Sequence, residues 1–340
     1  MTTQEDLAQA VTLLEQGKLV AFPTETVYGL GADAENPQAV AAIYTAKGRP
    51  QNHPVIVHIA PEADINYWVQ GCPAEAKILI QAFWPGPLTL ILKRAAHIPD
   101  AVSGGQDTVG LRCPSHPVAQ ALLRAFKQGQ GGLAAPSANK FGHVSPTTAA
   151  HVQEEFRDEA LVAQIVDGGQ SEVGIESTIV DLSRLATHGA VLLRPGHISQ
   201  EQLEQVLGSK VAAPDVNAPR ASGTLEAHYA PSTPVALVAV TELDLIIRQL
   251  VLAGKKVALM AYLPHQLAQV ETLQAWRQLG QEPVSYAHDL YADLRELDHV
   301  MADIILVEAL PESSAWQGVR DRLRRAAFDS QGVLQRMLGG

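Results

Sequence analysis

The chain has 340 residues, of which 46% are hydrophobic and 18% are charged, and its formal net charge is -11. This length and composition predict well-packed apolar cores and leave room for two domains. The acidic charge disfavours sequence-independent binding to nucleic acids or anionic membranes. Any anionic ligand must therefore meet a local cluster of basic side chains.

The cysteines and the N-terminus bear on the cellular compartment. Cys72 and Cys113 lie far apart, and neither belongs to a CxxC or another zinc-binding spacing. The N-terminal segment has no basic stretch followed by an apolar run, and no apolar segment approaches the ~18 residues of a membrane span. We therefore predict a cytoplasmic protein that is not bound to a membrane and has no protein-built metal site.

Helix-like and strand-like segments alternate along the chain, which predicts α/β architecture with largely parallel sheets. Thr2 and Glu5 fit a capping box for a first helix, which Gly17 would end. Strands are then predicted at 19–22, 55–59, 88–92, 108–112, 133–136, 165–167, 177–181 and 191–196, and helices at 37–47, 75–83 and 118–126.

The second half of the chain begins with a change in composition. Between about 211 and 234, Ala, Pro, Ser, Gly and Asn replace periodic apolar residues, which predicts a linker. A β-α-β unit over 235–260, a helix at 289–297, a strand at 304–307 and an arginine-rich closing helix then predict a second domain. The arginines of the closing helix are expected to face solvent. The predicted boundaries are 1–207, 208–234 for the linker and 235–340.

Strand 19–22 ends in an unusual polar run. Proline, hydroxyl groups, a carboxylate and two glycines occupy residues 23–31, where a core strand should continue. In α/β proteins strand ends carry the chemistry, although an ordinary polar turn is the better explanation of this run when it is taken alone. Residues 29–34 also fit a dinucleotide-binding pattern. The polar insertion after the strand, and the missing acid about twenty residues later, argue against that interpretation.

Four basic residues fall at the ends of predicted elements. Lys47 and Arg49 flank Gly48 and form a stiff positive fork suited to a polyphosphate, although cations at a helix C-terminus also complement its dipole. Arg112 and Arg194 each end a strand. In so acidic a chain, four such cations predict an anion-binding site.

Six segments together resemble the Sua5/YrdC family of threonylcarbamoyl-AMP synthases. They are 23–30 (PTETVYGL), 47–50 (KGRP), 84–87 (WPGP), 110–114 (GLRCP), 136–139 (PSAN) and 176–178 (EST). The resemblance extends to about residue 205, and the linker with its trailing domain is similar to the two-domain Sua5 form. It implies a YrdC-like twisted open sheet with helices, followed by a small Rossmann-like α/β domain. One position departs from the family pattern, because His53 stands before Pro54 where the family has asparagine.

The resemblance implies synthesis of L-threonylcarbamoyladenylate and pyrophosphate from L-threonine, bicarbonate and ATP with Mg2+, for t6A modification of tRNA. A separate tRNA threonylcarbamoyl transferase would receive the product, and stable tRNA binding is not expected. Lys47 and Arg49 would be catalytic. Threonine would be held by Thr26, His58, Arg112, Ala135 and Ser177. ATP would be held by Lys47, Arg49, His53, Thr108, Ser137, Asn139, Ser145, Arg194 and, from a linker that acts as a lid, Tyr229.

Two other interpretations stay open at this point. The first is a carbamoyl-adenylate step like that of hydrogenase-maturation proteins, but those carry zinc-finger segments and this chain has no CxxC pairs. The second is an RNA-binding YrdC-like module without catalysis, which the net charge disfavours. The Walker A, HExxH and GxSxG patterns are also missing, which argues against the common nucleotide hydrolases, zinc proteases and serine hydrolases.

Overall fold

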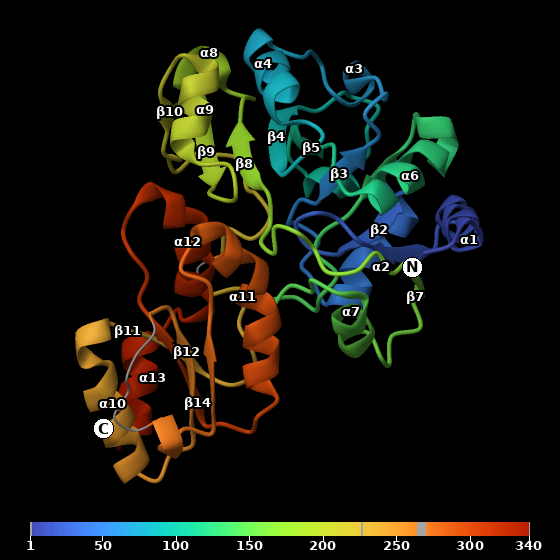
Figure 1. The fold of residues 1–340 in the computed structure, drawn as a ribbon. Helices are drawn as coiled ribbons and strands as arrows, with labels where there is room; N and C mark the ends of the chain where they lie inside the picture. The colour runs from blue at the N-terminus through green and yellow to red at the C-terminus, as the bar shows by residue number, and fades with distance from the viewer. Residues whose placement is uncertain (1, 226, 264–269, 340) are drawn as a thin grey trace. The chain divides into compact units, whose positions relative to one another are not determined.

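The structure is a computed structural model that describes residues 2–225, 227–263 and 270–339 (Figure 1). The chain forms two compact units. The first comprises Met1–Phe141 and Ser145–Thr224, and the second comprises Gly142–Val144 and Leu225–Gly340. The change from one unit to the other after Thr224 falls inside the segment that the sequence predicts as a linker.

The first unit is built on a ten-stranded sheet with the order β10-β9-β8-β4-β5-β3-β6-β2-β1-β7. Its strands are β1 (Leu19–Phe22), β2 (Gly29–Asp33), β3 (Ile56–Ile59), β4 (Leu88–Lys93), β5 (Thr108–Arg112), β6 (Gly132–Ala134), β7 (Val162–Ile165), β8 (Thr178–Asp181), β9 (Ala190–Arg194) and β10 (Val211–Ala212). The expectation of a largely parallel sheet is wrong for this unit. The pairs β1–β2, β2–β6, β3–β6, β4–β5 and β8–β9 are antiparallel. The polar run 23–28 is one cause, because it turns the chain back so that β2 pairs antiparallel with β1.

Helices surround this sheet. They are α1 (Gln4–Glu15), α2 (Pro37–Lys47), α3 (Ile65–Trp68), α4 (Ala74–Phe83), α5 (Asp100–Ser103), α6 (Pro117–Ala125), α7 (Ala149–Glu155), α8 (Leu185–His188) and α9 (Gln200–Leu207), with a 3-10 turn at Phe126–Gly129. The first cap differs from the prediction by one residue, because the box forms between Thr3 and Asp6. For α2 the prediction is confirmed, with Asn36 as the N-cap and Gly48 in the left-handed conformation (φ 63°) at its end.

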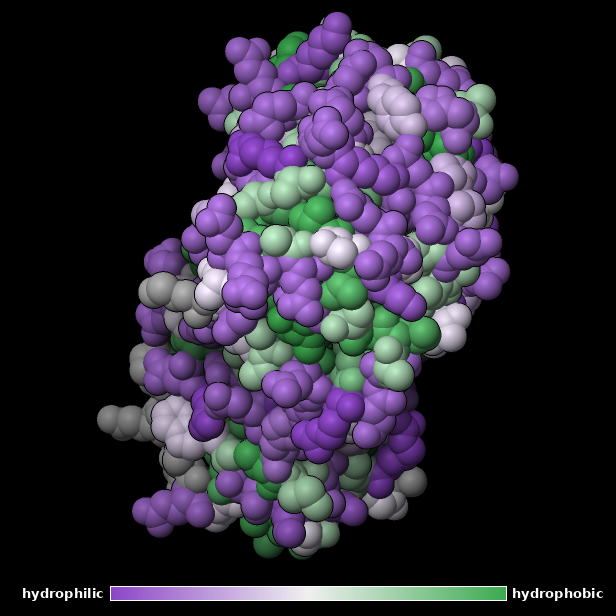
Figure 2. Space-filling view, turned by 90° about the vertical axis from the view of Figure 1, so that its right-hand side faces the viewer, coloured by the Kyte–Doolittle hydropathy of each residue, from purple (hydrophilic) through white to green (hydrophobic). Residues whose placement is uncertain are grey.

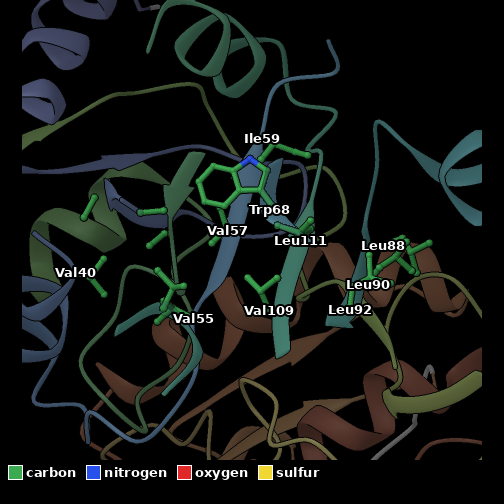
Figure 3. Packing of buried hydrophobic residues seen from close by; sticks show 14 of the residues in the cluster. Val40, Val55, Val57, Ile59, Trp68, Leu88, Leu90, Leu92, Val109 and Leu111 are labelled. Atoms are coloured by element: carbon green, nitrogen blue, oxygen red, sulfur yellow. The ribbon is translucent and has the colours of Figure 1, made fainter. Parts of the chain in front are cut away.

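The core of the first unit explains why its strands read as apolar runs. Residues on both faces of β3 are buried, since Val57 and Ile59 pack in one cluster and Ile56 in another. Figure 3 shows Trp68 beside Val57, with Leu111 of β5 and the leucines of β4 farther along the same layer. Strands covered on both faces lose the alternation of buried and exposed residues. One face of the molecule is drawn in Figure 2, where hydrophilic side chains predominate and hydrophobic ones gather in smaller patches.

The second unit has a four-stranded sheet with the order β11-β14-β12-β13, in which every pair is parallel. Its elements are β11 (Val235–Val238), α10 (Leu243–Leu252), β12 (Val257–Ala261), β13 (Ala275–Gln278), α11 (Pro283–Asp298), β14 (Ile304–Glu308), α12 (Gln317–Ala326) and α13 (Ser330–Met337), with 3-10 turns at Val240–Glu242, Val270–Thr272 and Ser314–Trp316. Together with the mixed sheet of the first unit, this confirms the predicted fold class. Within the described ranges, no helix is long and apolar enough to cross a membrane.

The arginine-rich helix α12 corrects one expectation. Arg324 faces solvent, but Arg322 is 0% exposed and Arg325 is also buried. Both contact Asp321 at 3.0 Å, and the guanidinium of Arg322 lies 5.5 Å from the centre of the Tyr229 ring. A carboxylate within the same helix, together with an aromatic ring, allows these two charges to be buried.

Candidate active site

The polar run after β1 forms a tightly bonded, buried loop. The Thr24 hydroxyl donates to the carbonyl of Val27 at 2.6 Å and accepts from the backbone N–H of Thr26 at 3.2 Å. It also lies 2.9 Å from the hydroxyl of Thr26. The backbone N–H of Tyr28 donates to the carbonyl of Pro146 at 2.9 Å, which ties the loop to a distant segment. Thr24 therefore fixes the position of the Thr26 hydroxyl.

Neighbouring strands bring three predicted threonine ligands together. His58 on β3 is paired with Arg112 on β5, and the backbone N–H of Ala135, just beyond β6, donates to the carbonyl of Ile56 at 2.9 Å. Burial and the charge of Arg112 lower the pKa of His58 to about 3, so its imidazole is neutral near pH 7. Among the described residues, His58 Nδ1 and Arg112 Nε have no hydrogen-bond partner. Buried polar atoms of this kind are candidates for ligand contacts.

Ser177 and Arg194 join two further parts of the site. The Ser177 hydroxyl lies 2.8 Å from that of Thr89 on β4, and it accepts from Arg194 Nη2 at 3.2 Å. Arg194 Nε and Nη2 also donate to the carbonyl of Ser177, at 3.1 and 2.9 Å. A residue predicted to bind threonine is thus in direct contact with a residue predicted to bind ATP.

Lys47 reaches into the loop after β6. Its ammonium donates to the carbonyl of Ser137 at 2.6 Å and to that of Asn139. This loop is held in turn by an isolated bridge between Gly29 and Ser137. Burial, followed by the charge of Arg49, holds the pKa of Lys47 well below its ordinary value. A nearby polyphosphate would reverse that effect by favouring the charged amine.

Arg49 and His53 both lie close to the aromatic ring of Phe141. The Arg49 guanidinium is 5.7 Å from the centre of the Phe141 ring, and the His53 ring is 5.5 Å from it. Arg49 Nη2 also donates to the carbonyl of Pro54 at 2.9 Å and to the hydroxyl of Ser222 at 3.4 Å. Burial and the charge of Arg49 lower the pKa of His53.

Two protein-family models match this chain. Residues 12–196 match the Sua5, YciO and YrdC family model, described as "Telomere recombination", and residues 198–328 match the model described as "Threonylcarbamoyl-AMP synthase, C-terminal domain". The chain belongs to the Sua5 family of threonylcarbamoyl-AMP synthases. The predicted family is thereby confirmed, and the synthase interpretation is supported over the RNA-binding module.

Individual Sua5-family relatives match over nearly their whole length. The chain is 38% identical over 329 residues to the threonylcarbamoyl-AMP synthase of Pyrococcus abyssi, covering 94% of this chain and 93% of that protein. It is 38% identical over 340 residues to that of Bacillus subtilis, covering 96% and 94%. The crystal structure of P. abyssi Sua5 complexed with L-threonine has a TM-score of 0.85 at 35% identity and covers 96% of each chain.

Three further predicted ATP ligands of this Sua5-family chain make other contacts. The Ser145 hydroxyl donates to the buried carboxylate of Glu176 at 2.5 Å. Thr108 begins β5, four residues before Arg112 and about 13 Å along the strand. Tyr229 belongs to the second unit, where it is 1% exposed and packs 5.8 Å from the ring of Tyr291.

The structure also adds residues that the sequence did not single out for the site. Glu25 pairs with Arg112, Thr24 orients Thr26, Glu176 accepts from Ser145, and Ser222 contacts both Arg49 and, through its carbonyl, Arg194. Glu25 and Glu176 lie inside segments that carry the family resemblance, so the signal for them was present. Ser222 lies in the predicted linker, where composition gave no such signal.

Proposed function

We propose that the protein forms L-threonylcarbamoyladenylate and pyrophosphate from L-threonine, bicarbonate and ATP in its first unit. The observation that carries this proposal is the contact between Ser177 and Arg194. This contact supports the proposal, because a predicted threonine ligand lies beside a predicted ATP ligand and a reaction between the two substrates requires such proximity.

In the threonine subsite, Arg112 would bind the carboxylate, for which a guanidinium is geometrically matched. The hydroxyls of Thr26 and Ser177, the neutral imidazole of His58 and the backbone at Ala135 would surround the rest of the amino acid. A neutral imidazole can accept a hydrogen bond from the substrate, whereas a protonated one could only donate. Burial and Arg112 keep His58 in the accepting state.

In the nucleotide subsite, Lys47, Arg49 and Arg194 would neutralise the phosphates. His53, Thr108, Ser137, Asn139 and Ser145 would complete the ATP contacts. Threonine's amine and bicarbonate form a carbamate with loss of water, and a carbamate oxygen then attacks the α-phosphorus. The bond from the α-phosphorus to the bridging oxygen breaks, and pyrophosphate leaves with that electron pair. No enzyme nucleophile is needed, because positioning and charge stabilisation suffice.

Mg2+ would be carried mainly by the nucleotide. The described residues contain no group of three or more His, Cys, Asp or Glu side chains that could hold a metal. Glu176 nevertheless places one buried carboxylate beside the hydroxyl of Ser145. Magnesium in nucleotide sites commonly combines one or two carboxylates with phosphates and waters, so Glu176 and Ser145 fit such an ion. Bound there, Mg2+ would offset charge on the departing pyrophosphate.

Tyr229 would approach the nucleotide as part of a linker lid. Its backbone has φ +62°, a left-handed conformation that costs a tyrosine of order 1 kcal/mol or more. Its ring packs against Tyr291 and Arg322 within the second unit. We further propose that the product passes to a separate tRNA threonylcarbamoyl transferase, and that the protein works in the cytoplasm.

The test is pyrophosphate release by the purified protein with ATP, Mg2+ and bicarbonate. L-threonine, L-serine and no amino acid would be compared, and the product identified by mass spectrometry. We expect release that depends on threonine and yields threonylcarbamoyl-AMP. Release without any amino acid, or none although ATP binds, would contradict the proposal.

A further inference from the structure

The carboxylate of Glu25 is not among the predicted substrate contacts, yet it lies against one of the residues that make them. Glu25 is 2% exposed, and its Oε1 is 2.7 Å from Arg112 Nη2. Its Oε2 accepts a hydrogen bond from the backbone N–H of Ser115 at 3.1 Å. The backbone carbonyl of Glu25 accepts one from the backbone N–H of Val173 at 2.7 Å. Glu25 is therefore held by two other chain segments, its carboxylate by residues 112–115 and its backbone by Val173.

This ion pair leaves two nitrogens of the Arg112 guanidinium without a hydrogen bond. Nε and Nη2 of Arg112 have no hydrogen-bond partner in the described part of the chain, although Nη2 is in contact with Glu25. The contact is close but is not aligned as a hydrogen bond. Nε and Nη2 form one edge of the guanidinium, and such an edge can receive both oxygens of a carboxylate. Glu25 thus pairs with Arg112 through Nη2, while Nε and the N–H directions of Nη2 remain without an aligned hydrogen bond.

Arg194 shows how backbone carbonyls can hold the donors of a buried guanidinium. Its Nε and Nη2 edge donates to the carbonyl of Ser177, and its Nη1 donates to that of Ser222 at 2.8 Å. A buried Arg112 deprived of its carboxylate would gain by turning toward carbonyls in the same way, because uncompensated buried charge is costly. That rotation would withdraw its donors from an amino-acid ligand.

From these contacts we infer that Glu25 is a positioning residue for the amino-acid substrate. It holds the Nε and Nη2 edge of Arg112 toward the ligand carboxylate, so affinity for threonine depends on Glu25 while affinity for ATP does not. This inference rests on the proposed function, since it assumes that Arg112 binds the carboxylate of threonine.

Glu25→Gln tests it, because glutamine keeps the size and the acceptor for Ser115 but removes the charge. Calorimetric titrations would compare L-threonine, L-threoninamide and ATP. We expect L-threonine to bind about tenfold more weakly or worse, as for loss of an interaction with a charged group, and ATP to bind as before. The preference of the wild type for L-threonine over its amide should also shrink, because only the carboxylate uses the Arg112 edge.

Asp33→Asn is the matched control. Asp33 is likewise buried, and it pairs with Lys127 at 2.8 Å in the same unit, so its loss reports on the general effect of removing a buried carboxylate. Thermal unfolding with and without ATP would establish that each variant is folded. Unchanged or tighter threonine binding by folded Glu25→Gln would overturn the inference, as would an equal loss for threonine and its amide. If the wild type binds ATP but no threonine, the proposed function itself fails.

Discussion

Both compact units bury basic side chains, but they surround them differently. In the second unit, Arg322 and Arg325 share the carboxylate of Asp321, and despite its burial these arginines hold the pKa of Asp321 below its ordinary value. In the first unit, Lys47 donates to two backbone carbonyls, and no carboxylate of the described residues is within ion-pair distance of it.

The partner of a buried cation indicates its role: a carboxylate partner stabilises the fold, whereas carbonyl partners leave the cation able to bind an anionic ligand. A carboxylate cancels the charge of a buried arginine, whereas carbonyl dipoles leave the charge of a lysine largely uncompensated. An incoming phosphate can then supply the missing negative charge. Arg112 is an intermediate case, because Glu25 pairs with it while its Nε and Nη2 make no hydrogen bond within the described part of the chain.

The largest expected effect on stability follows from disrupting the buried arginine cluster of the second unit. Asp321→Asn removes a negative charge that contacts both buried Arg322 and buried Arg325, which should lower the free energy of unfolding by about 3 kcal/mol. Urea denaturation followed by circular dichroism measures this change. Asp329→Asn is the control, because Asp329 pairs with Arg336 at the surface and should cost about 1 kcal/mol or less. Equal losses in the two variants would show that burial of the pair does not matter.

A smaller effect concerns acid stability of the first unit. The pKa of His58 is about 3 in the folded protein, whereas the ordinary value for histidine is 6.5. Between pH 3 and pH 6.5 the unfolded chain therefore binds more protons at this residue than the folded protein does. Stability should therefore fall as pH drops from about 6.5 toward 3, by at most about 1.4 kcal/mol per pH unit from this residue. Urea titrations at pH 7 and pH 5 check this. His58→Gln should reduce the pH dependence without abolishing it, because His53 and His197 also have lowered pKa values. An unchanged pH dependence would contradict the assignment.

The smallest expected effect is the uptake of a fraction of a proton when ATP binds. ATP should raise the pKa of Lys47 by bringing negative charge to a buried, destabilised amine, so binding should take up protons. At pH 8, well above the phosphate pKa of about 6, the nucleotide itself contributes little. Calorimetric titration of ATP in two buffers with different ionisation enthalpies measures the uptake. Lys47→Met should remove it, and net proton release by the wild type would contradict the expected sign.

Local sequence signals predicted much of the fold. Asn36 and Gly48 set the limits of α2, and apolar runs marked the strands that carry His58 and Arg112 and the strand that follows Ser177. The antiparallel return of β2 was not predictable, because strand order depends on contacts between distant segments. Strand β13 was missed because Ala275–Gln278 has neither alternation nor β-branched residues.

Part of the candidate site could likewise be predicted from local sequence, and part of it could not. Residue types and spacing pointed to Lys47, Arg49, Arg112 and Arg194 as an anion site, while the family resemblance supplied the assignment of substrates. The contact between Glu25 and Arg112 joins a loop to a strand far along the chain, and no local pattern encodes it. Placement of Tyr229 in the second unit is likewise a product of tertiary packing.

The measurement that tests the central claim most directly is made on Lys47→Met. Formation of threonylcarbamoyl-AMP and the free energy of unfolding would be determined on the same preparation, beside the wild type. We predict that product formation falls at least about 100-fold, as for loss of a charge-stabilising group in an active site. Stability should change by less than about 2 kcal/mol, since two carbonyls lose a donor but an unfavourable buried charge is also removed. Full activity, or a protein that no longer folds, would contradict the claim that this cation is kept for the substrate.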